Sequence, residues 1–442
     1  MTRRVAVHTR SKRRSGSPVA YVVCGLALAT GVLLRAGLPQ PANRTPDELA
    51  YTVYSAILSR SGLGTEPTLV TRYTTEQILG EVPPPTRVGF LWLGSAFMSI
   101  TGSSLVTTLV SISTLCSILQ LFVVAAIALG AFDGWVAAIA VLFLACSPLD
   151  LAIARRAWVD DVLGLVASLM LWAFVRAAAQ PERRVWPALV FALGTYATLV
   201  KETGVLLVLL GALGLAIVAW RNVAASAPPG HARVSLRPLV MLLGGAASVA
   251  IAAATLSLAC GGFAPWWKAL EHTSRAVASN DYVRQYQTGS ALYYAQGVWI
   301  LQPLPWLLGA LGTLLVVVRA PFMRVRWTEP GSSRALQAVA WYTAALLLVA
   351  CLYPQKNLRF LSPIYGSIAI LAALTLRAAR DWARAHLPAR ARNALRVATA
   401  LTAVLIVLSV SADVRRFADL FLGRQIPDLA TPWFTGHALP PP

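Results

Sequence analysis

Residues 103–130, SSLVTTLVSISTLCSILQLFVVAAIALG, form an apolar stretch without a single charged residue. A helix of roughly 20 apolar residues crosses a hydrocarbon core about 30 Å thick, so this stretch is long enough to span a membrane. Similar runs recur along the 442-residue chain, in which 57% of residues are hydrophobic and 13% charged. Soluble domains carry roughly 25% charged residues. The sequence therefore predicts an all-α, polytopic integral membrane protein.

Ten further apolar runs bring the predicted number of transmembrane helices to about eleven. They cover residues 19–38, 135–151, 162–179, 186–200, 203–220, 239–260, 298–318, 336–352, 360–379 and 393–412. The apolar run at 88–102 has only about 15 residues, which predicts an interfacial or re-entrant helix. Residues 19–412 are thus expected to form one transmembrane domain.

Positive charges predict how the chain is oriented. The tail at residues 1–18 is basic, which by the positive-inside rule places it in the cytoplasm, with the protein in the cytoplasmic membrane. Residues 39–102 then form a long first outer loop, residues 261–297 a second, and residues 413–442 a short extracytoplasmic tail. The run at 19–38 is also compatible with a signal peptide, because residues 39–42 offer a small-residue break.

The net charge of +20 fits this topology. Basic residues cluster in short segments between apolar runs, without a continuous basic helix or a zinc-finger spacing, so nucleic acid is not an expected partner. The predicted inner loops contain Arg183, Arg184, Arg221, Arg233, Arg237, Arg319, Arg324, Arg326, Arg334, Arg380, Arg384, Arg390, Arg392 and Arg396.

Five basic residues fall on short outer connections, where the positive-inside rule disfavours them. They are Arg155, Arg156, Lys201, Lys356 and Arg359. Either anionic groups meet them there or their side chains extend to lipid headgroups. The spacing of Lys356 and Arg359 beside helix ends suits a lipid-linked phosphate, because both give charge-assisted hydrogen bonds. Lys201 and Glu202 follow a short apolar run, and their side chains are expected in a recessed cavity.

Carboxylates accompany these cations at the predicted outer face. Asp47 and Glu48 follow Pro46 just beyond the first span, where one of them could take a proton from a hydroxyl. The alternative is a helix N-terminus with Thr45 as its cap. Asp160 lies in the same short charged turn as Arg155.

Two further features leave alternatives open. The loop at 261–297 contains aromatic residues such as Trp266 and Tyr286, which suit either sugar faces or the aromatic belt of a membrane interface. No histidine, cysteine or carboxylate cluster has metal-ligand spacing, although Asp47 and Asp160 could share an all-oxygen site across loops.

The serial order of the short motifs resembles the GT-C membrane glycosyltransferases, in the branch of the protein O-mannosyltransferases and lipid A aminoarabinose transferases. The resemblance covers about residues 46–363. Its motifs are Pro46-Asp47-Glu48, a Pro-Pro element at Pro83, Arg155-x-x-x-x-Asp160, Thr198-x-x-Lys201 and Lys356-x-x-Arg359-Phe360-Leu361-x-Pro363. Family members often carry Lys or His before the Pro-Pro element, whereas Val82 stands here, so Arg87 or Arg72 would substitute.

This resemblance implies a polyprenyl-phosphate-linked sugar as donor, an acceptor lipid, glycan or protein on the outer side, and inversion at the anomeric carbon. It implies neither a metal nor another cofactor. The implied general base is Asp47, supported by Glu48, with Asp160 as a further catalytic residue. The implied donor-phosphate ligands are Arg155, Lys201, Lys356, Arg359 and Arg87.

A transporter or flippase of a lipid-linked sugar is the alternative, because charged groups inside a membrane protein also line transport pathways. In this sequence the polar groups gather at one predicted face, and no internal repeat is visible. Both features favour chemistry at the membrane surface.

Overall fold

The computed structural model describes residues 17–76, 83–102, 105–226, 235–318 and 330–435. Its described elements are helices, joined by turns and by one isolated β-bridge between Thr288 and Gln355. The predicted all-α class is therefore confirmed. The basic tail predicted for residues 1–18 falls almost entirely outside the described residues, as do Arg233, Arg319, Arg324 and Arg326.

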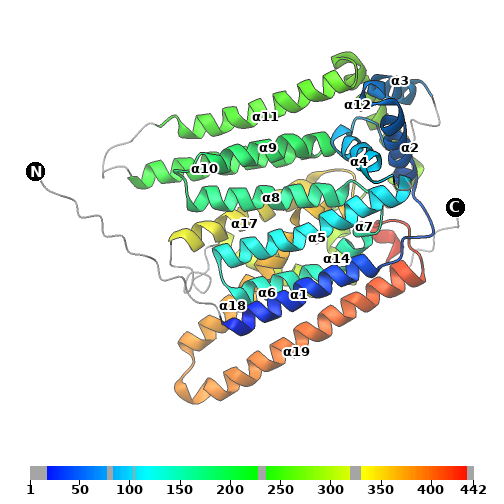
Figure 1. The fold of residues 1–442 in the computed structure, drawn as a ribbon. Helices are drawn as coiled ribbons and strands as arrows, with labels where there is room; N and C mark the ends of the chain where they lie inside the picture. Colours follow the sequence, from blue (N-terminus) through cyan, green and yellow to red (C-terminus); the bar gives the residue numbers. More distant parts are fainter. Residues whose placement is uncertain (1–16, 77–82, 103–104, 227–234, 319–329, 436–442) are drawn as a thin grey trace, which may run out of the picture.

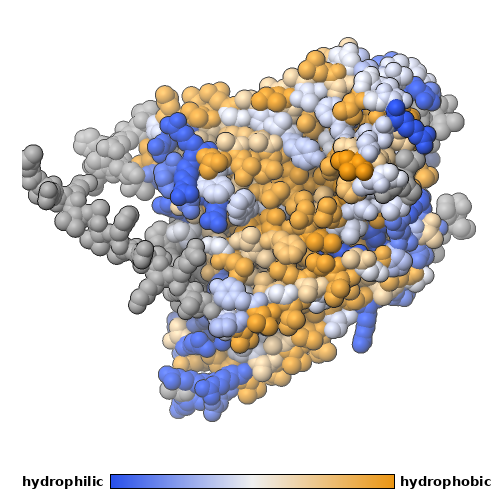
Figure 2. Space-filling model, in the orientation of Figure 1, coloured by the Kyte–Doolittle hydropathy of each residue, from blue (hydrophilic) through white to orange (hydrophobic). Residues whose placement is uncertain are grey.

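Eight helical segments in the described part of the chain are long and apolar enough to cross a membrane. Helices lie side by side along one direction, and Figure 2 shows apolar residues over the sides of the bundle with hydrophilic residues at its two ends. The segments are α1 (Pro18–Gly37), α5 (Leu105–Ala131), α8 (Asp160–Ala179), α10 (Gly204–Ser226), α11 (Arg237–Ala259), α17 (Pro330–Leu352), η3 with α18 (Leu358–Ile364, Tyr365–His386) and α19 (Arg392–Phe417) with η5 (Ala418–Gly423).

One bent pair of helices is the candidate for a ninth span. Helices α6 (Gly134–Ala145) and α7 (Pro148–Ala154) meet at an angle of 59°. Pro148 begins α7, and a proline cannot continue the hydrogen bonds of a preceding helix. Among the described residues, length and composition thus give eight or nine spans, so the predicted eleven is not confirmed. The difference lies in α9 (Val185–Val200) and α15 (Pro303–Val317), which at about 1.5 Å per residue are short for a full crossing.

Short helices gather at one end of the bundle (Figure 1). The predicted first outer loop folds into α2 (Pro46–Ser61), α3 (Glu66–Thr75) and α4 (Val88–Thr101). Helix α12 (Phe263–Ser279) packs against α3, and α13 (Asp281–Tyr286) and α14 (Leu292–Leu301) follow it. The C-terminal ends of α1 and α19 lie here as well, because both helices begin at the opposite end of the bundle.

The C-terminal segment, residues 424–435, folds back across the same end. It follows the π-helical turn η5 and contains a short 3-10 helix, η6 (Thr431–Trp433). Ile426, Leu429 and Ala430 are buried within it. Apolar side chains at these positions explain why this segment packs onto the bundle instead of extending into solvent.

Candidate active site

A cavity of about 2150 Å³ opens at the end where the short helices gather. Ordinary small-molecule sites enclose roughly 300–1,000 Å³, so this cavity has room for more than one substrate. Its walls come from segments far apart in the sequence: the start of α2, the beginnings of α8 and α10, helices α12 and α13, the end of α17, η3 and the C-terminal segment.

Asp47 and Arg359 face each other across this cavity. Asp47 lies in the first turn of α2, where Thr45 and Glu48 form a capping box, so the predicted helix N-terminus is present. Arg359 Nη1 donates to Asp47 Oδ2 at 2.8 Å. The Arg359 side chain is 14% exposed and the Asp47 side chain 24%, so both are accessible from the cavity. The guanidinium also lies 5.0 Å from the ring centroid of Trp158.

Asp160 and Lys201 form a second pair that lines the cavity. Lys201 Nζ lies 2.7 Å from Asp160 Oδ1 and 4.6 Å from the ring centroid of Phe360. Asp160 begins α8, and Lys201 terminates α9. Burial lowers the pKa of the Lys201 ammonium, and the Asp160 carboxylate opposes part of this shift. The recessed position predicted for Lys201 agrees with its burial.

Close helix packing fixes the position of Lys201. A Cβ added to Gly204 would lie 2.2 Å from the backbone carbonyl of Ala197, and one added to Gly89 would lie 2.9 Å from the backbone nitrogen of Val200. Only glycine permits backbones to approach this closely. Gly204 and Gly89 therefore let α10 and α4 press against the end of α9, immediately before Lys201.

We expect Gly204→Ala to lower the stability of the folded protein by about 1–3 kcal/mol, because overpacking forces the backbone apart. Thermal unfolding in detergent measures this effect as a fall in midpoint. Gly25→Ala in α1 is the matched control, since a Cβ there meets no atom within 4 Å. Equal midpoints for the two variants would show that the close approach at Gly204 is not required.

Arg87 and Glu202 form a third ion pair. Arg87 Nε lies 3.2 Å from Glu202 Oε2, and its Nη1 donates to the Tyr51 hydroxyl. Burial alone would raise the pKa of the Glu202 carboxyl, but Arg87 beside it holds that pKa below its usual value. Both residues line the cavity. Glu202 was expected in a recessed cavity beside Lys201 but was assigned no chemical role, and Tyr51 was not among the predicted site residues.

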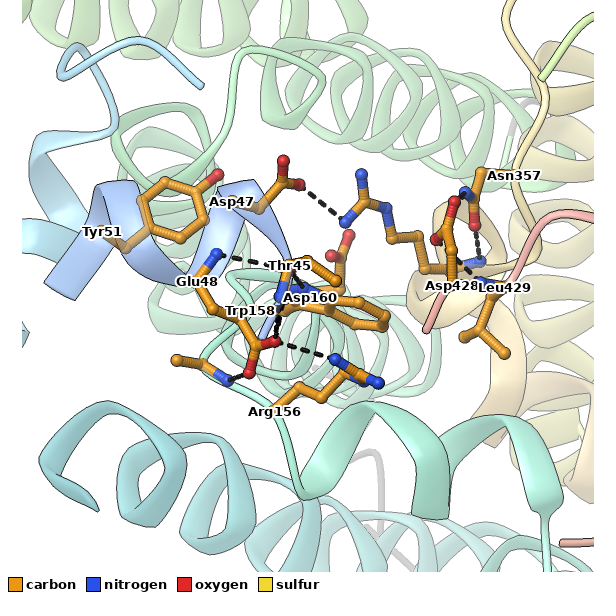
Figure 3. Close-up of polar contacts among 12 residues, drawn as sticks. Thr45, Asp47, Glu48, Tyr51, Arg156, Trp158, Asp160, Asn357, Asp428 and Leu429 are labelled. Atoms are coloured by element: carbon orange, nitrogen blue, oxygen red, sulfur yellow. Dashed lines mark hydrogen bonds and ion pairs between the residues drawn. The ribbon is translucent and has the colours of Figure 1, made fainter. Parts of the chain in front are cut away.

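Glu48 points away from Asp47 and out of the cavity (Figure 3). Its side chain is fully buried and lies 2.8 Å from Arg156 Nη1. It also accepts hydrogen bonds from the backbone nitrogens of Ala157 at 3.1 Å and Thr45 at 2.9 Å. These contacts join the start of α2 to the turn before α8, so the geometry supports a structural role for Glu48.

Arg155 and Lys356 also have other partners. Arg155 donates to the carbonyl oxygens of Pro39 at 2.8 Å and Phe421 at 2.9 Å. Lys356 donates to the carbonyl oxygen of Cys351 at 2.8 Å and thereby caps the end of α17. Neither side chain is among the described residues that line the cavity. Of the predicted donor-phosphate ligands, the structure brings Lys201, Arg359 and Arg87 together.

More basic than acidic side chains line the cavity among the described residues. Seven basic and five acidic side chains line it among the described residues. They are Arg44, Arg87, Lys201, Arg275, Arg284, Arg359 and Arg424, with Asp47, Asp160, Glu202, Glu271 and Asp428. No group of three or more histidine, cysteine, aspartate or glutamate side chains in the described part of the chain is arranged to hold a metal ion. This balance suits an anionic ligand held by side chains.

Glu66 is a buried carboxyl outside the candidate membrane-spanning helices. It begins α3, its side chain is fully buried, and this burial raises its pKa to about 8. The folded chain therefore holds a proton that the unfolded chain releases above about pH 4.5. This contribution to stability is complete below that pH and is lost as the pH rises to about 8.

We expect the thermal midpoint to fall between pH 5 and pH 8, and Glu66→Gln to make this fall shallower, because the amide does not ionise. Thermal unfolding across this pH range measures both slopes. Glu182→Gln is the control, since Glu182 is exposed in the turn before α9. The same slope for Glu66→Gln and wild type would contradict a raised pKa at Glu66.

Comparisons with known proteins identify a matching family and structures with a similar fold. Residues 84–255 match the family described as dolichyl-phosphate-mannose-protein mannosyltransferase. The fold is similar to that of ArnT from Cupriavidus metallidurans in the apo state, at 18% identity and a TM-score of 0.51, over 87% of this chain and 63% of that chain. No curated protein sequence matches the chain.

Two archaeal structures share the fold. The oligosaccharyltransferase of Archaeoglobus fulgidus, tethered with an acceptor peptide, matches at 16% identity and a TM-score of 0.55, over 92% of this chain and 55% of that chain. AglB from the same organism was solved in complex with an inhibitory peptide and a dolichol-phosphate. It matches at 14% identity and a TM-score of 0.53, over 96% of this chain and 61% of that chain. The chain thus spans less than two thirds of the length of these relatives.

The fold and the cavity at its polar end define the class: this multi-pass membrane protein has the fold of the GT-C glycosyltransferases. The predicted resemblance to the branch of the protein O-mannosyltransferases and lipid A aminoarabinose transferases is confirmed by the match at residues 84–255 together with the likeness to ArnT.

Proposed function

We propose that this chain is a membrane glycosyltransferase. It moves a sugar from a polyprenyl-phosphate-linked donor to an acceptor hydroxyl at the outer face of the cytoplasmic membrane, with inversion at the anomeric carbon. The observation that carries this proposal is the pairing of Asp47 with Arg359 in a cavity that Lys201 and Arg87 also line. A base and a set of anion-binding cations thus share one space at the end of an apolar bundle.

The cavity has an apolar wall suited to a lipid-linked donor. Leu206 and Leu207 of α10 and Leu346 and Val349 of α17 line it, and both helices belong to the membrane-spanning set. A polyprenyl chain would lie along these side chains, because its burial removes apolar surface from water. AglB, which shares the fold, was solved with a dolichol-phosphate, and this supports a lipid-phosphate ligand.

The donor phosphate would be held by Lys201, Arg359 and Arg87, where charge-assisted hydrogen bonds stabilise the negative charge that grows as the sugar leaves. Asp160 holds the Lys201 ammonium in place through the ion pair at 2.7 Å. A phosphate on Arg359 also competes with Asp47 for the guanidinium. The Asp47 carboxylate oxygen that Arg359 releases is then free to accept the proton of the acceptor hydroxyl.

Asp47 would act as the general base. It takes the proton of the acceptor hydroxyl while that oxygen attacks the anomeric carbon. The bond between this carbon and the phosphate oxygen breaks, and its electron pair leaves with the polyprenyl phosphate. Attack from the face opposite the leaving group inverts the configuration. The cavity contributes by holding both substrates in line.

The acceptor side of the cavity is polar. Tyr282, Gln287, Gln355 and Trp433 line it on the side of α13 and the C-terminal segment. Hydroxyl, amide and aromatic groups of this kind suit the acceptor classes implied by the resemblance, namely a lipid headgroup, a glycan or a protein segment. A cavity with both apolar and polar lining residues can hold a lipid-linked donor together with a polar acceptor.

A transfer assay in proteoliposomes tests the proposal and separates it from the transporter alternative. The purified protein is given a polyprenyl-phosphate sugar with a radiolabelled sugar, together with an extract of envelope acceptors. A glycosyltransferase moves the label to an acceptor and releases free polyprenyl phosphate. Movement of the label across the bilayer with its phosphate bond intact would instead identify a transporter or flippase.

A further inference from the structure

The C-terminal segment forms part of the cavity wall. Arg424, Ile426, Asp428 and Trp433 are among its residues that line the cavity. Two hydrogen bonds anchor its backbone: Arg156 Nη2 donates to the carbonyl oxygen of Ile426 at 3.4 Å, and the Leu358 nitrogen donates to that of Leu429 at 3.1 Å. The second bond attaches the segment to the start of η3, the helix that carries Arg359.

Asp428 collects hydrogen bonds from three separate parts of the chain. Its Oδ2 accepts from the Tyr282 hydroxyl at 2.8 Å and from Gln287 Nε2 at 3.0 Å. Both carboxylate oxygens lie 3.1 Å from Asn357 Nδ2, and Oδ1 accepts from the Leu429 nitrogen at 2.7 Å. Figure 3 shows Asp428 directly beside Asn357 and Leu429. Asp428 is only 8% exposed, so these hydrogen-bond donors, and not water, stabilise its carboxylate.

Asn357 connects Asp428 to Arg359 through two hydrogen bonds of its side chain. Because its amide nitrogen donates to Asp428, its Oδ1 is the atom left to accept from the Arg359 backbone nitrogen, at 3.1 Å. This bond caps η3 at the residue that reaches Asp47. A continuous series of contacts therefore runs from Asp428 through Asn357 and Arg359 to Asp47.

We propose that Asp428 is a positioning residue for the Arg359–Asp47 pair, and that the C-terminal segment is an integral part of the site. The importance of this pair for sugar transfer rests on the proposed function above. An amide at position 428 would turn N–H groups toward the donors of Tyr282, Gln287 and Asn357. Asn357 would then lose its fixed orientation, and η3 would lose its cap.

Cross-linking tests this inference without any substrate. In a Cys351→Ser background, Asp47→Cys and Arg359→Cys are joined by a short bifunctional thiol reagent in nanodiscs; the other four cysteines are buried. We expect Asp428→Asn to lower the cross-linking yield at least threefold. Asp419→Asn is the matched control, because Asp419 pairs with Arg424 at the surface, 59% exposed. An unchanged yield for Asp428→Asn overturns the inference.

A second variant covers the case in which Asp428→Asn does not fold. Asn357→Ala leaves Asp428 bonded to Tyr282, Gln287 and the Leu429 nitrogen but removes the side-chain acceptor of the Arg359 backbone nitrogen. The inference predicts the same loss of cross-linking from this variant. A yield equal to that of the control would show that Asn357 does not transmit the position of Asp428.

Kinetics provide an independent test, because a purely structural role of Asp428 would not change the KM for one substrate more than for the other. With the native pair in place, we expect Asp428→Asn to raise the KM for the donor about tenfold, because Arg359 is displaced from the phosphate. The acceptor KM should rise less, through the lost contacts of Asp428 with Tyr282 and Gln287 on the acceptor wall. Equal changes in both KM values would contradict a positioning role. If wild type transfers no sugar while cross-linking still depends on Asp428, the proposed function fails and the positioning role stands.

Discussion

Replacing Asp47 by asparagine is expected to reduce sugar transfer by about 10²–10⁴-fold, the usual contribution of a general base. The amide has nearly the shape of the carboxylate but cannot take the proton of the acceptor hydroxyl. The loss should appear in kcat, because proton transfer occurs in the transition state. Single-turnover transfer from a radiolabelled polyprenyl-phosphate sugar measures the step directly.

Binding separates this effect from damage to the site. Arg359 loses its carboxylate partner in Asp47→Asn, so the variant should bind polyprenyl phosphate at least as tightly as wild type. Asp281→Asn is the matched control, since that carboxylate is 92% exposed and lies outside the described cavity lining. Transfer by Asp47→Asn at the rate of this control would remove Asp47 as the base.

Glu48→Ala should act on stability, although Glu48 is the sequence neighbour of Asp47. The substitution leaves the buried Arg156 guanidinium without its ion-pair partner and leaves the Ala157 backbone nitrogen without an acceptor. Removing one partner of a buried ion pair costs about 3–5 kcal/mol. We therefore expect a large fall in thermal midpoint in detergent, with loss of folded protein in membranes.

Glu76→Ala supplies the comparison. Glu76 pairs with Arg72 at the surface, where the two side chains are 45% and 50% exposed, and such pairs contribute about 0–1 kcal/mol. Its thermal midpoint should stay close to that of wild type. A Glu48→Ala protein that is stable but inactive would instead support a direct catalytic role for Glu48.

Apolar run length predicted the fold class because a hydrocarbon core imposes both length and composition on a spanning helix. It could not decide how many spans there are, since α9 and α15 are shorter than a full crossing and α6 is separated from α7 by a bend. Whether such helices cross the membrane depends on packing against neighbours. Packing is a tertiary property that run length does not contain.

Residue order indicated that Asp47, Asp160, Lys201 and Arg359 lie near one another, because each lies at a helix end on the same side of the bundle. Residue order could not predict which way the side chains of adjacent residues point. Successive side chains in a helix point about 100° apart, so Asp47 faces the cavity while Glu48 faces Arg156.

Other parts of the site left no signal in the sequence. Lys356 turns back to cap α17 and Arg155 binds backbone carbonyls, and neither orientation follows from charge or spacing. Asp428 lies in a segment that resembles an ordinary tail, and its contacts with Tyr282 and Asn357 join residues more than 70 positions apart. Such long-range contacts arise only when the chain is folded.

Thiol labelling in intact cells tests most directly whether the cavity opens on the outer side of the membrane. Asp47→Cys, Arg359→Cys and Arg183→Cys are made singly in a Cys351→Ser background and treated with a membrane-impermeant maleimide. We expect the first two to react in intact cells. Arg183→Cys, exposed in the turn between the end of α8 and the start of α9, should react only after permeabilisation. Labelling of positions 47 and 359 from opposite sides, or of both only after permeabilisation, would contradict this expectation.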